Sequence, residues 1–247
     1  MRFSEAFSIK GAKKHDWFDA DLTVDTKLFV DPFLMLRAGD QWIQAHADLV
    51  AHFAHCYQLV ARAPSKQSLS AKQAHKLLTF PEPHEFCLGY TTASTRGSGG
   101  GAGRAAAIAD GIAVAVAAGL KRPEHIEEIG ILNERFGADS ISDATLNILK
   151  AHFVRYTRGV AAELGIPVAE HRLRNAAVDL ELSRWETEVV ELSISALTFL
   201  TWASGFPMIA ALTDSSPMSR RTYLTPHSSN QRFASACGER QHLPEGG

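Results

Sequence analysis

The chain has 247 residues, of which 45% are hydrophobic and 21% charged, and its 25 Lys and Arg nearly balance 27 Asp and Glu. This composition excludes a wholly disordered chain, a collagen and a coiled coil, and the net charge of −2 argues against a protein that wraps nucleic acid with a uniformly basic surface. The length predicts one large domain, or one domain with a small appendage.

Cysteine usage and apolar runs indicate a cytoplasmic, soluble protein. Cys56, Cys87 and Cys237 are too few and too far apart for a disulfide framework or a Cys-x-x-Cys metal site. Residues 1–15 lack the apolar centre of a signal peptide, and the apolar run 105–120 is too short and too rich in alanine to span a membrane. We therefore expect a reducing cytosol and no membrane partner.

The first half of the chain predicts one strand followed by helices. Residues 22–30 alternate between apolar and polar side chains, which is typical of a strand, and Pro32 ends it. Apolar residues spaced by three and four predict helices over 41–61 and 70–78. We interpret 85–91 as a second, short strand.

The second half predicts two more helices and two short strands. An alanine-rich helix follows a glycine-rich run and extends to Leu120. The regular apolar spacing over 139–164 predicts the best-defined helix, which Gly165 ends. Short strands are expected over 177–182 and 188–193. The fold class is therefore helix-rich α+β, or mixed α/β, with helices packed on a small sheet.

The composition changes abruptly near residue 204, where Ser, Thr, Pro and Gly become frequent. Such a segment buries too little apolar surface to offset its ordering entropy. We interpret 1–203 as a single globular domain and 204–247 as a tail of low order. The change also suggests that the chain beyond Leu192 is a truncated or out-of-frame end, which the other two reading frames of the gene would reveal.

The first candidate site is the glycine-rich run between Arg96 and Arg104, which precedes a predicted helix. Small residues let backbone N–H groups approach a phosphate, and the helix N-terminus adds positive potential. Gly99, Gly101 and Gly103 would then bind the phosphate, with Arg96 and Arg104 adding charge-assisted contacts. No Gly-Lys-Ser/Thr ends the run, so it is not a P-loop, and the alternative is a flexible connector or mobile lid.

The second candidate is the acidic end of the first predicted strand. Asp25, Lys27 and Asp31 share one face of it. Grouped carboxylates can hold Mg²⁺ and a nearby lysine can steady a phosphoryl group. The alternative is a solvated strand face that ends in an Asp-Pro turn.

The third candidate is the start of the helix predicted over 139–164. Asp139, Asp143 and Asn147 are four residues apart and share one helix face, so they could bind a metal ion or a polar ligand. The alternative is a capping box in which Ser140 caps the helix and Asp143 is its third residue. Capping does not explain Asn147, which is a poor residue for a helix interior.

Three stretches carry a family resemblance: KLFVDPF (27–33), LGY with the glycine-rich run (88–104), and GADSISDATLNI (137–148). Together they resemble an uncharacterised family of bacterial cytosolic proteins that occurs among mobile and defence genes. The resemblance covers about residues 1–192 and implies no reaction. It marks four polar residues as a site: Asp31, Asp139, Asp143 and Asn147.

Two functions of different class follow from these patterns. The first is a non-catalytic binding or assembly module, in which the glycine-rich run grips a nucleotide or a protein partner. The second is a metal-dependent phosphoesterase or nuclease-like enzyme, in which Asp31, Asp139 and Asp143 converge on Mg²⁺ while Lys27 and Arg104 bind phosphate oxygens. Nucleic acid would bind only through a local basic groove or a partner, because the chain as a whole is nearly neutral.

Overall fold

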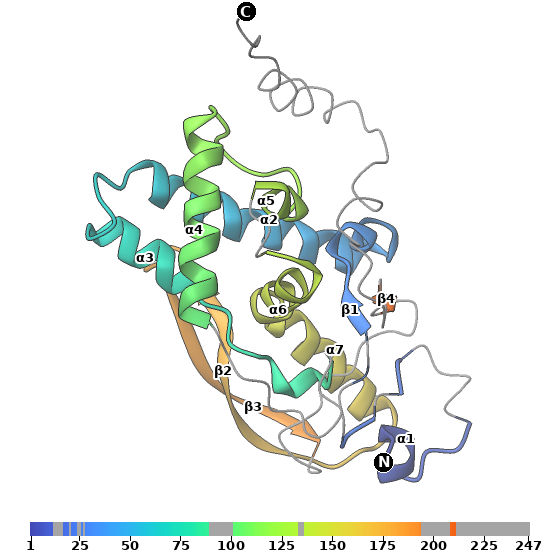
Figure 1. Ribbon diagram of the computed structural model, residues 1–247. Coiled ribbons are helices and arrows are strands. Elements are labelled where there is room, and N and C mark those ends of the chain that lie inside the picture. The colour runs from blue at the N-terminus through green and yellow to red at the C-terminus, as the bar shows by residue number, and fades with distance from the viewer. Residues whose placement is uncertain are drawn as a thin grey trace, which may run out of the picture. The chain divides into compact units, whose positions relative to one another are not determined.

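The structure is a computed structural model that describes residues 1–11, 17–19, 21–23, 26, 28–88, 101–132, 136–193 and 208–210. Its helices and strands are, in chain order, α1 (Phe3–Ala6), β1 (Leu28–Val30), the 3-10 helix η2 (Pro32–Arg37), α2 (Asp40–Ala61), α3 (Leu69–Leu77), the 3-10 helix η3 (His84–Phe86), α4 (Gly101–Ala117), α5 (Glu127–Leu132), α6 (Ala138–Ile148), α7 (Lys150–Glu163), β2 (Val168–Asp179), β3 (Arg184–Ser193) and β4 (Met208–Ala210). Helices dominate and the strands form two small antiparallel sheets, β1 with β4 and β2 with β3, which confirms the helix-rich α+β class (Figure 1).

Helix α2 is the centre of the core. It packs against α3, α4 and α6 (Figure 1). The predicted apolar stripe is buried, with Leu49, Phe53 and Cys56 fully covered, because residues spaced by three and four share one helix face. The helices predicted over 41–61 and 70–78 are confirmed, and each begins one residue earlier than expected.

The single helix predicted over 139–164 is wrong in one respect: it is two helices, α6 and α7. The backbone of Leu149 has φ −94° and ψ 11°, which interrupts the helix between them. The apolar spacing continues across the break, since Leu146, Leu149 and Phe153 are all buried. Periodicity therefore identified the buried face but not the change of direction.

The predicted strands differ from the observed ones in length. Among the described residues of 22–30, Leu22 and Thr23 form a bend, Thr26 makes an isolated bridge, and a regular strand covers 28–30, which pairs with β4, so the predicted strand begins too early. The strand expected over 177–182 coincides with the observed one at 177–179, because β2 begins at Val168 and ends at Asp179, whose carboxylate accepts a hydrogen bond from the Leu182 N–H at 2.9 Å. This contact closes the turn between β2 and β3.

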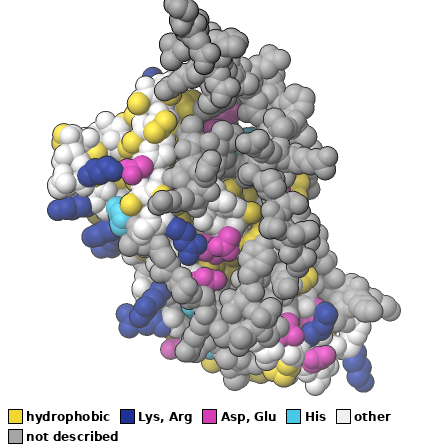
Figure 2. Space-filling view, in the orientation of Figure 1, with side chains coloured by type: hydrophobic (Ala, Val, Ile, Leu, Met, Phe, Trp, Pro, Cys, Tyr) yellow, Lys and Arg dark blue, Asp and Glu magenta, His cyan; other side chains and the backbone are white. Residues whose placement is uncertain are grey.

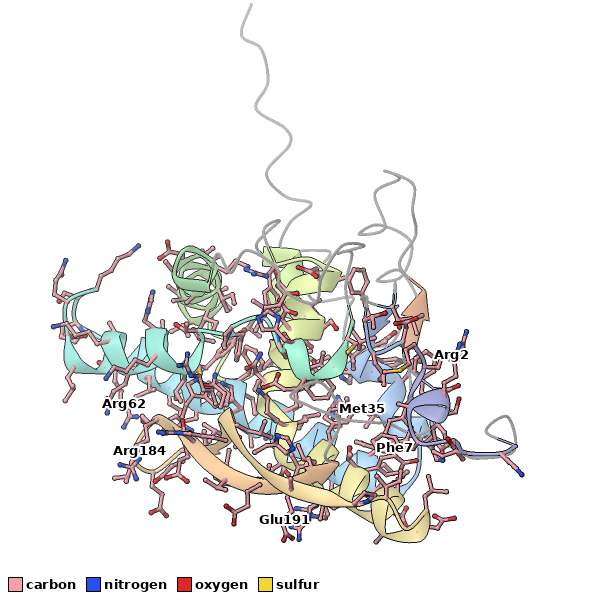
Figure 3. The ribbon with its side chains drawn as sticks, turned by 90° about the horizontal axis from the view of Figure 1, so that it is seen from below. Arg2, Phe7, Met35, Arg62, Arg184 and Glu191 are labelled. Atoms are coloured by element: carbon pink, nitrogen blue, oxygen red, sulfur yellow. The ribbon has the colours of Figure 1, made fainter. Side chains whose placement is uncertain are left out.

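The β2–β3 hairpin packs against α3, α6 and α7. Figure 3 shows it from below, with Arg184 at the start and Glu191 near the end of β3. The Trp185 indole donates to the Lys76 carbonyl of α3 at 3.0 Å and packs near Phe80, with ring centroids 6.1 Å apart. One face of the hairpin is thereby part of the core.

The segment 81–88 contacts α6 and α7, because its Pro81 carbonyl accepts a hydrogen bond from Asn147 and its Glu85 carboxylate accepts one from Lys150. It was predicted as a strand from residue 85, but residues 84–86 form η3, and Leu88 makes only an isolated parallel bridge with Thr26. Residues 89–91 lie outside the described part of the chain. Two prolines, Pro81 and Pro83, remove backbone donors and disfavour a regular strand at its start.

All described residues lie within one compact unit, residues 1–211. The predicted tail, 204–247, lies outside the described residues except for 208–210, so the division at 203 stays a prediction. Within the described ranges, no helix combines the length and the apolar character needed to cross a bilayer.

Candidate functional site

Helix α6 begins before Ser140, which the capping-box interpretation requires as the N-cap. The N-cap of α6 is Gly137, and no side chain caps the helix. Ser140 is therefore already inside the helix, and the capping-box interpretation of Ser140 and Asp143 is wrong. Asp139 lies in the first turn and Asp143 in the second, where every residue is buried.

Arg104 brings the start of α4 to this acidic face. Its guanidinium Nη1 lies 3.1 Å from the Asp143 Oδ2 and 3.5 Å from the Asp139 Oδ2. The Asp143 side chain is 9% exposed, the Arg104 side chain 27% and the Asp139 side chain 52%, so the contact runs from the interior to the surface. Figure 2 shows basic and acidic side chains next to one another near the centre of the view.

A third acidic residue, Glu82, also affects the pKa of Asp143. Burial raises the pKa of Asp143 from 3.8 to about 8, and the negative charges of Asp139 and Glu82 add to this effect. The charge and hydrogen bond of Arg104 lower the pKa, but they do not offset the other causes. We call these four residues, Arg104, Asp139, Asp143 and Glu82, the Arg104 cluster. At neutral pH it holds a proton on Asp143 and keeps a surplus of negative charge.

Asn147 continues the polar face of α6 inward and is completely buried. Its side-chain amide donates to the carbonyls of Pro81 and Asp143, both at 2.8 Å, and its Oδ1 accepts from Asn175 at 3.4 Å. These bonds tie segment 81–88 and strand β2 to α6. They also explain an asparagine in a helix interior, which the sequence had left without a reason.

Lys150 extends the same polar face and was missed from the sequence. It is 2% exposed, and its Nζ donates to Glu85 at 3.2 Å and to the Arg174 carbonyl at 2.9 Å. Burial lowers the pKa of Lys150, and the Glu85 carboxylate works in the opposite direction. The only sign of this role in the sequence is that Lys150 follows Asn147 by three residues, a spacing that places two side chains on one face of a helix.

Asp31 has contacts of its own. It is the N-cap of η2, and its carboxylate accepts from the Phe33 N–H at 3.0 Å; burial raises its pKa. The preceding residue reaches α6, since the Val30 N–H donates to the Ser142 hydroxyl at 3.1 Å. Within the described residues, the charges that shift the pKa of Asp143 come from Asp139, Glu82 and Arg104, and Asp31 is not among them.

The remaining predicted residues divide between the start of α4 and the part of the chain outside the described ranges. Gly101 and Gly103 are in the first turn of α4, directly before Arg104. Lys27, Arg96 and Gly99 lie outside the described residues. In the described ranges, no group of three or more His, Cys, Asp or Glu side chains is arranged to hold a metal ion.

The structure thus joins two of the three candidate sites, through Arg104 of the glycine-rich run and Asp139 and Asp143 of α6. Comparison with curated proteins and with solved structures gave no match. A family model described as a domain of unknown function, DUF8370, matches residues 8–200, which is most of the chain. The chain therefore belongs to the DUF8370 family.

Proposed function

We propose that this protein is a non-catalytic binding module that recognises a positively charged group, most simply an arginine or lysine side chain of a protein partner, at the Arg104 cluster. The observation that carries the proposal is the position of Arg104 itself. Its guanidinium lies at hydrogen-bonding distance from Asp139 and Asp143, so these two carboxyl groups are already arranged to bind such a group.

The charge balance of the cluster favours a cationic ligand. Burial, together with the negative charges of Asp139 and Glu82, raises the pKa of Asp143 to about 8, and the guanidinium of Arg104 only partly offsets these causes. A second cation near Asp139, the most exposed of the three contacting side chains, would be attracted by the remaining negative charge. An anion such as a phosphate would be repelled unless a cation accompanied it.

Binding is favoured over catalysis because the other polar groups of this face are already used in internal contacts. The Asn147 amide holds the Pro81 carbonyl, and the Lys150 ammonium holds Glu85. Neither group is available to a substrate without breaking bonds that hold the fold together. Asp31, which the enzyme hypothesis needs as a third carboxylate, is engaged as the cap of η2.

The proposal is tested with a capped tri-arginine peptide as the probe, titrated by calorimetry at low salt. We expect Asp139→Asn to weaken its binding several-fold and Arg104→Gln to strengthen it, because the glutamine leaves the carboxylates without their internal cation. Wild-type affinity should also rise between pH 6.5 and pH 9, as Asp143 ionises. Asp143→Asn should lack this rise.

The matched control is Asp110→Asn. Asp110 is on α4 like Arg104, but it is 56% exposed and paired with Lys66 away from the cluster. It should leave peptide binding unchanged. The proposal fails if Arg104→Gln binds the peptide more weakly than the wild type while its far-ultraviolet circular dichroism spectrum is unchanged.

A metal-dependent phosphoesterase or nuclease-like enzyme is the second candidate. Asp139 and Asp143 meet at one point beside the end of the glycine-rich run, and Mg²⁺ is usually held by one or two carboxylates together with substrate phosphates. Titration of the wild type and Asp143→Ala with Mg²⁺ and Mn²⁺ separates the two candidates. Equal metal binding by both proteins removes Asp143 from the enzyme hypothesis.

The resemblance of the three sequence stretches adds an expected setting. We propose that the protein works in the cytosol of a bacterium and belongs to a mobile or defence gene set. Partners encoded next to it would then be the first source of the basic side chain. Co-purification with neighbouring gene products, in the wild type and in Asp139→Asn, checks this. If the product of a neighbouring gene co-purifies equally with both proteins, it does not bind through the Arg104 cluster.

A further inference from the structure

The end of α2, the turn after it and α3 form a basic surface. No Asp or Glu occurs between Asp48 and Glu82, although the chain as a whole contains 27 of them and has a net charge of −2. Four basic side chains of this stretch are exposed: Arg62, Lys66, Lys72 and Lys76. We call these four residues the α3 surface. Figure 2 shows basic side chains gathered over α3, at the left of the view.

Helix α3 holds its two lysines in a fixed direction. Lys72 and Lys76 are four residues apart and therefore share one face of the helix. Ala74 and Leu77 of the same helix are buried in the core. The packing of α2, α4 and β3 on α3, together with the bond from the Trp185 indole to the Lys76 carbonyl, fixes the orientation of the helix. The lysine face is thus a permanent part of the surface.

Most of the positive charge on the α3 surface has no counter-ion. Lys66 lies 2.6 Å from Asp110 of α4, and both side chains are more than half exposed. The Arg62 Nε donates to a backbone carbonyl of α2, which leaves its charge uncompensated. Among the described residues, the ion pairs include neither Lys72 nor Lys76. Three cations therefore face the solvent and attract polyanions.

The other side chains of this stretch favour a nucleic acid over a membrane. Ser65 and Gln67 are exposed between the cations, and such side chains commonly donate hydrogen bonds to phosphate oxygens. Leu69 is the one large apolar side chain that residues 58–79, all of them described, expose to the solvent. A single leucine provides much less apolar area than the apolar face of a helix that lies in a bilayer surface.

The same stretch favours duplex DNA over single strands and over RNA. Residues 58–79 contain no Phe, Tyr or Trp, so they have no such ring on which the bases of a single strand could stack. The major groove of B-form DNA is wide enough to admit an exposed helix, whereas that of A-form RNA is deep and narrow. The lysines of α3 can therefore reach the phosphates that flank the groove of DNA.

We propose that the α3 surface binds the phosphate backbone of duplex DNA without regard to its base sequence. It provides the local basic region that a nearly neutral chain needs for this purpose. The α3 surface shares no residue with the Arg104 cluster and does not depend on the function proposed there.

Fluorescence anisotropy with a labelled DNA duplex of random sequence tests the proposal, with the full chain as the titrant at several NaCl concentrations. Three phosphate contacts predict that the logarithm of the binding constant falls with the logarithm of the salt concentration with a slope of about −3. The double variant Lys72→Gln with Lys76→Gln should bind more weakly at every salt concentration, with a slope of about −1.

Asp110→Asn tests the surface in the opposite direction. It removes the carboxylate beside Lys66, so it should strengthen DNA binding and steepen the slope by up to about 1. The matched control is Lys10→Gln, which makes the same change of charge at an exposed residue after α1. Figures 1 and 3 show α1 and α3 on opposite sides of the described unit, so this control should bind DNA like the wild type.

Two comparison ligands distinguish DNA from the other polyanions. An RNA duplex of the same sequence and vesicles of phosphatidylglycerol should both bind more weakly than the DNA. Leu69→Ser should bind DNA like the wild type, since the leucine contacts no phosphate. The proposal is overturned if RNA or the vesicles bind at least as tightly as DNA. It is also overturned if the double lysine variant, with an unchanged circular dichroism spectrum, binds DNA like the wild type.

Discussion

Asp143, Asn147 and Lys150 form a polar row through the protein interior, and each has a different partner. The row connects α6 and α7 with segment 81–88 and with β2. Charged groups in such places cost free energy unless they are paired, and removal of one partner costs more than exchange of both. The row is therefore both a candidate site and a source of stability, and its members should respond differently to substitution.

The pH dependence of stability should be traceable to Asp143. Its pKa is about 8 in the folded protein against 3.8 as the ordinary value, so between these pH values the folded state keeps a proton that the unfolded chain has released. The free energy of unfolding therefore falls as pH rises through this window, by up to about 1.4 kcal/mol per pH unit from this group. Asp143→Asn should remove this contribution.

Urea unfolding of the wild type and of Asp143→Asn between pH 4.5 and pH 8.5 measures the contribution of Asp143 to the free energy of unfolding. We expect the variant to be the more stable of the two at pH 8, with a difference that shrinks toward pH 4.5. A difference that stays constant across this range would mean that Asp143 titrates normally.

Among the charged residues, neutralisation of Lys150 should cause the largest loss in the free energy of unfolding. Lys150→Met leaves the Glu85 carboxylate, whose side chain is 18% exposed, without its cation and the Arg174 carbonyl without a donor. We expect a loss of about 3 kcal/mol in the free energy of unfolding at pH 7. The double variant Lys150→Met with Glu85→Gln should recover part of this loss.

The matched comparison is the pair Arg158–Glu191, which has the same 3.2 Å distance but is more than half exposed on both sides. Arg158→Gln should change the stability by no more than about 0.5 kcal/mol. If Lys150→Met and Arg158→Gln lower the free energy of unfolding equally, burial is not the reason why the Lys150–Glu85 contact stabilises the protein.

At the level of the elements, two glycines inside helices should respond in opposite directions to alanine. A Cβ at Gly159 of α7 meets nothing within 4 Å, so Gly159→Ala should stabilise the protein by about 0.5–1 kcal/mol through a less flexible unfolded chain. A Cβ at Gly130 of α5 would lie 2.8 Å from the Phe136 carbonyl oxygen. Gly130→Ala should therefore destabilise by about 1–3 kcal/mol.

Thermal unfolding of the two alanine variants checks this, with the wild type measured alongside. The melting temperature should rise for Gly159→Ala and fall for Gly130→Ala. The same direction of change in both would show that helix propensity alone, and not the space around each glycine, decides the outcome.

At the scale of the whole molecule, the predicted division of the chain at residue 203 can be tested by limited proteolysis. The predicted tail contains the trypsin sites Arg220, Arg221, Arg232 and Arg240. If 204–247 has low order, these sites should be cut before those within the helices, because trypsin needs an exposed and locally unfolded backbone. Mass spectrometry of the first fragments identifies the order. Early cleavage inside α2 or α7 would contradict the division.

The sequence by itself determined the features that depend on local periodicity. Apolar spacing located α2 and α3 to within one residue, and a spacing of four placed Asp139 and Asp143 on one helix face. These succeed because a helix repeats every 3.6 residues whatever surrounds it.

The tertiary structure alone decided which groups meet. Arg104 reaches α6 across 35 and 39 residues, and Asn147 holds the Pro81 carbonyl across 66. The end of α6 at Leu149 and the pairing of β1 with residues 208–210 are of the same kind. Their cause is the cost of leaving polar groups unpaired away from water, which depends on how the whole chain packs and leaves no periodic trace in the sequence.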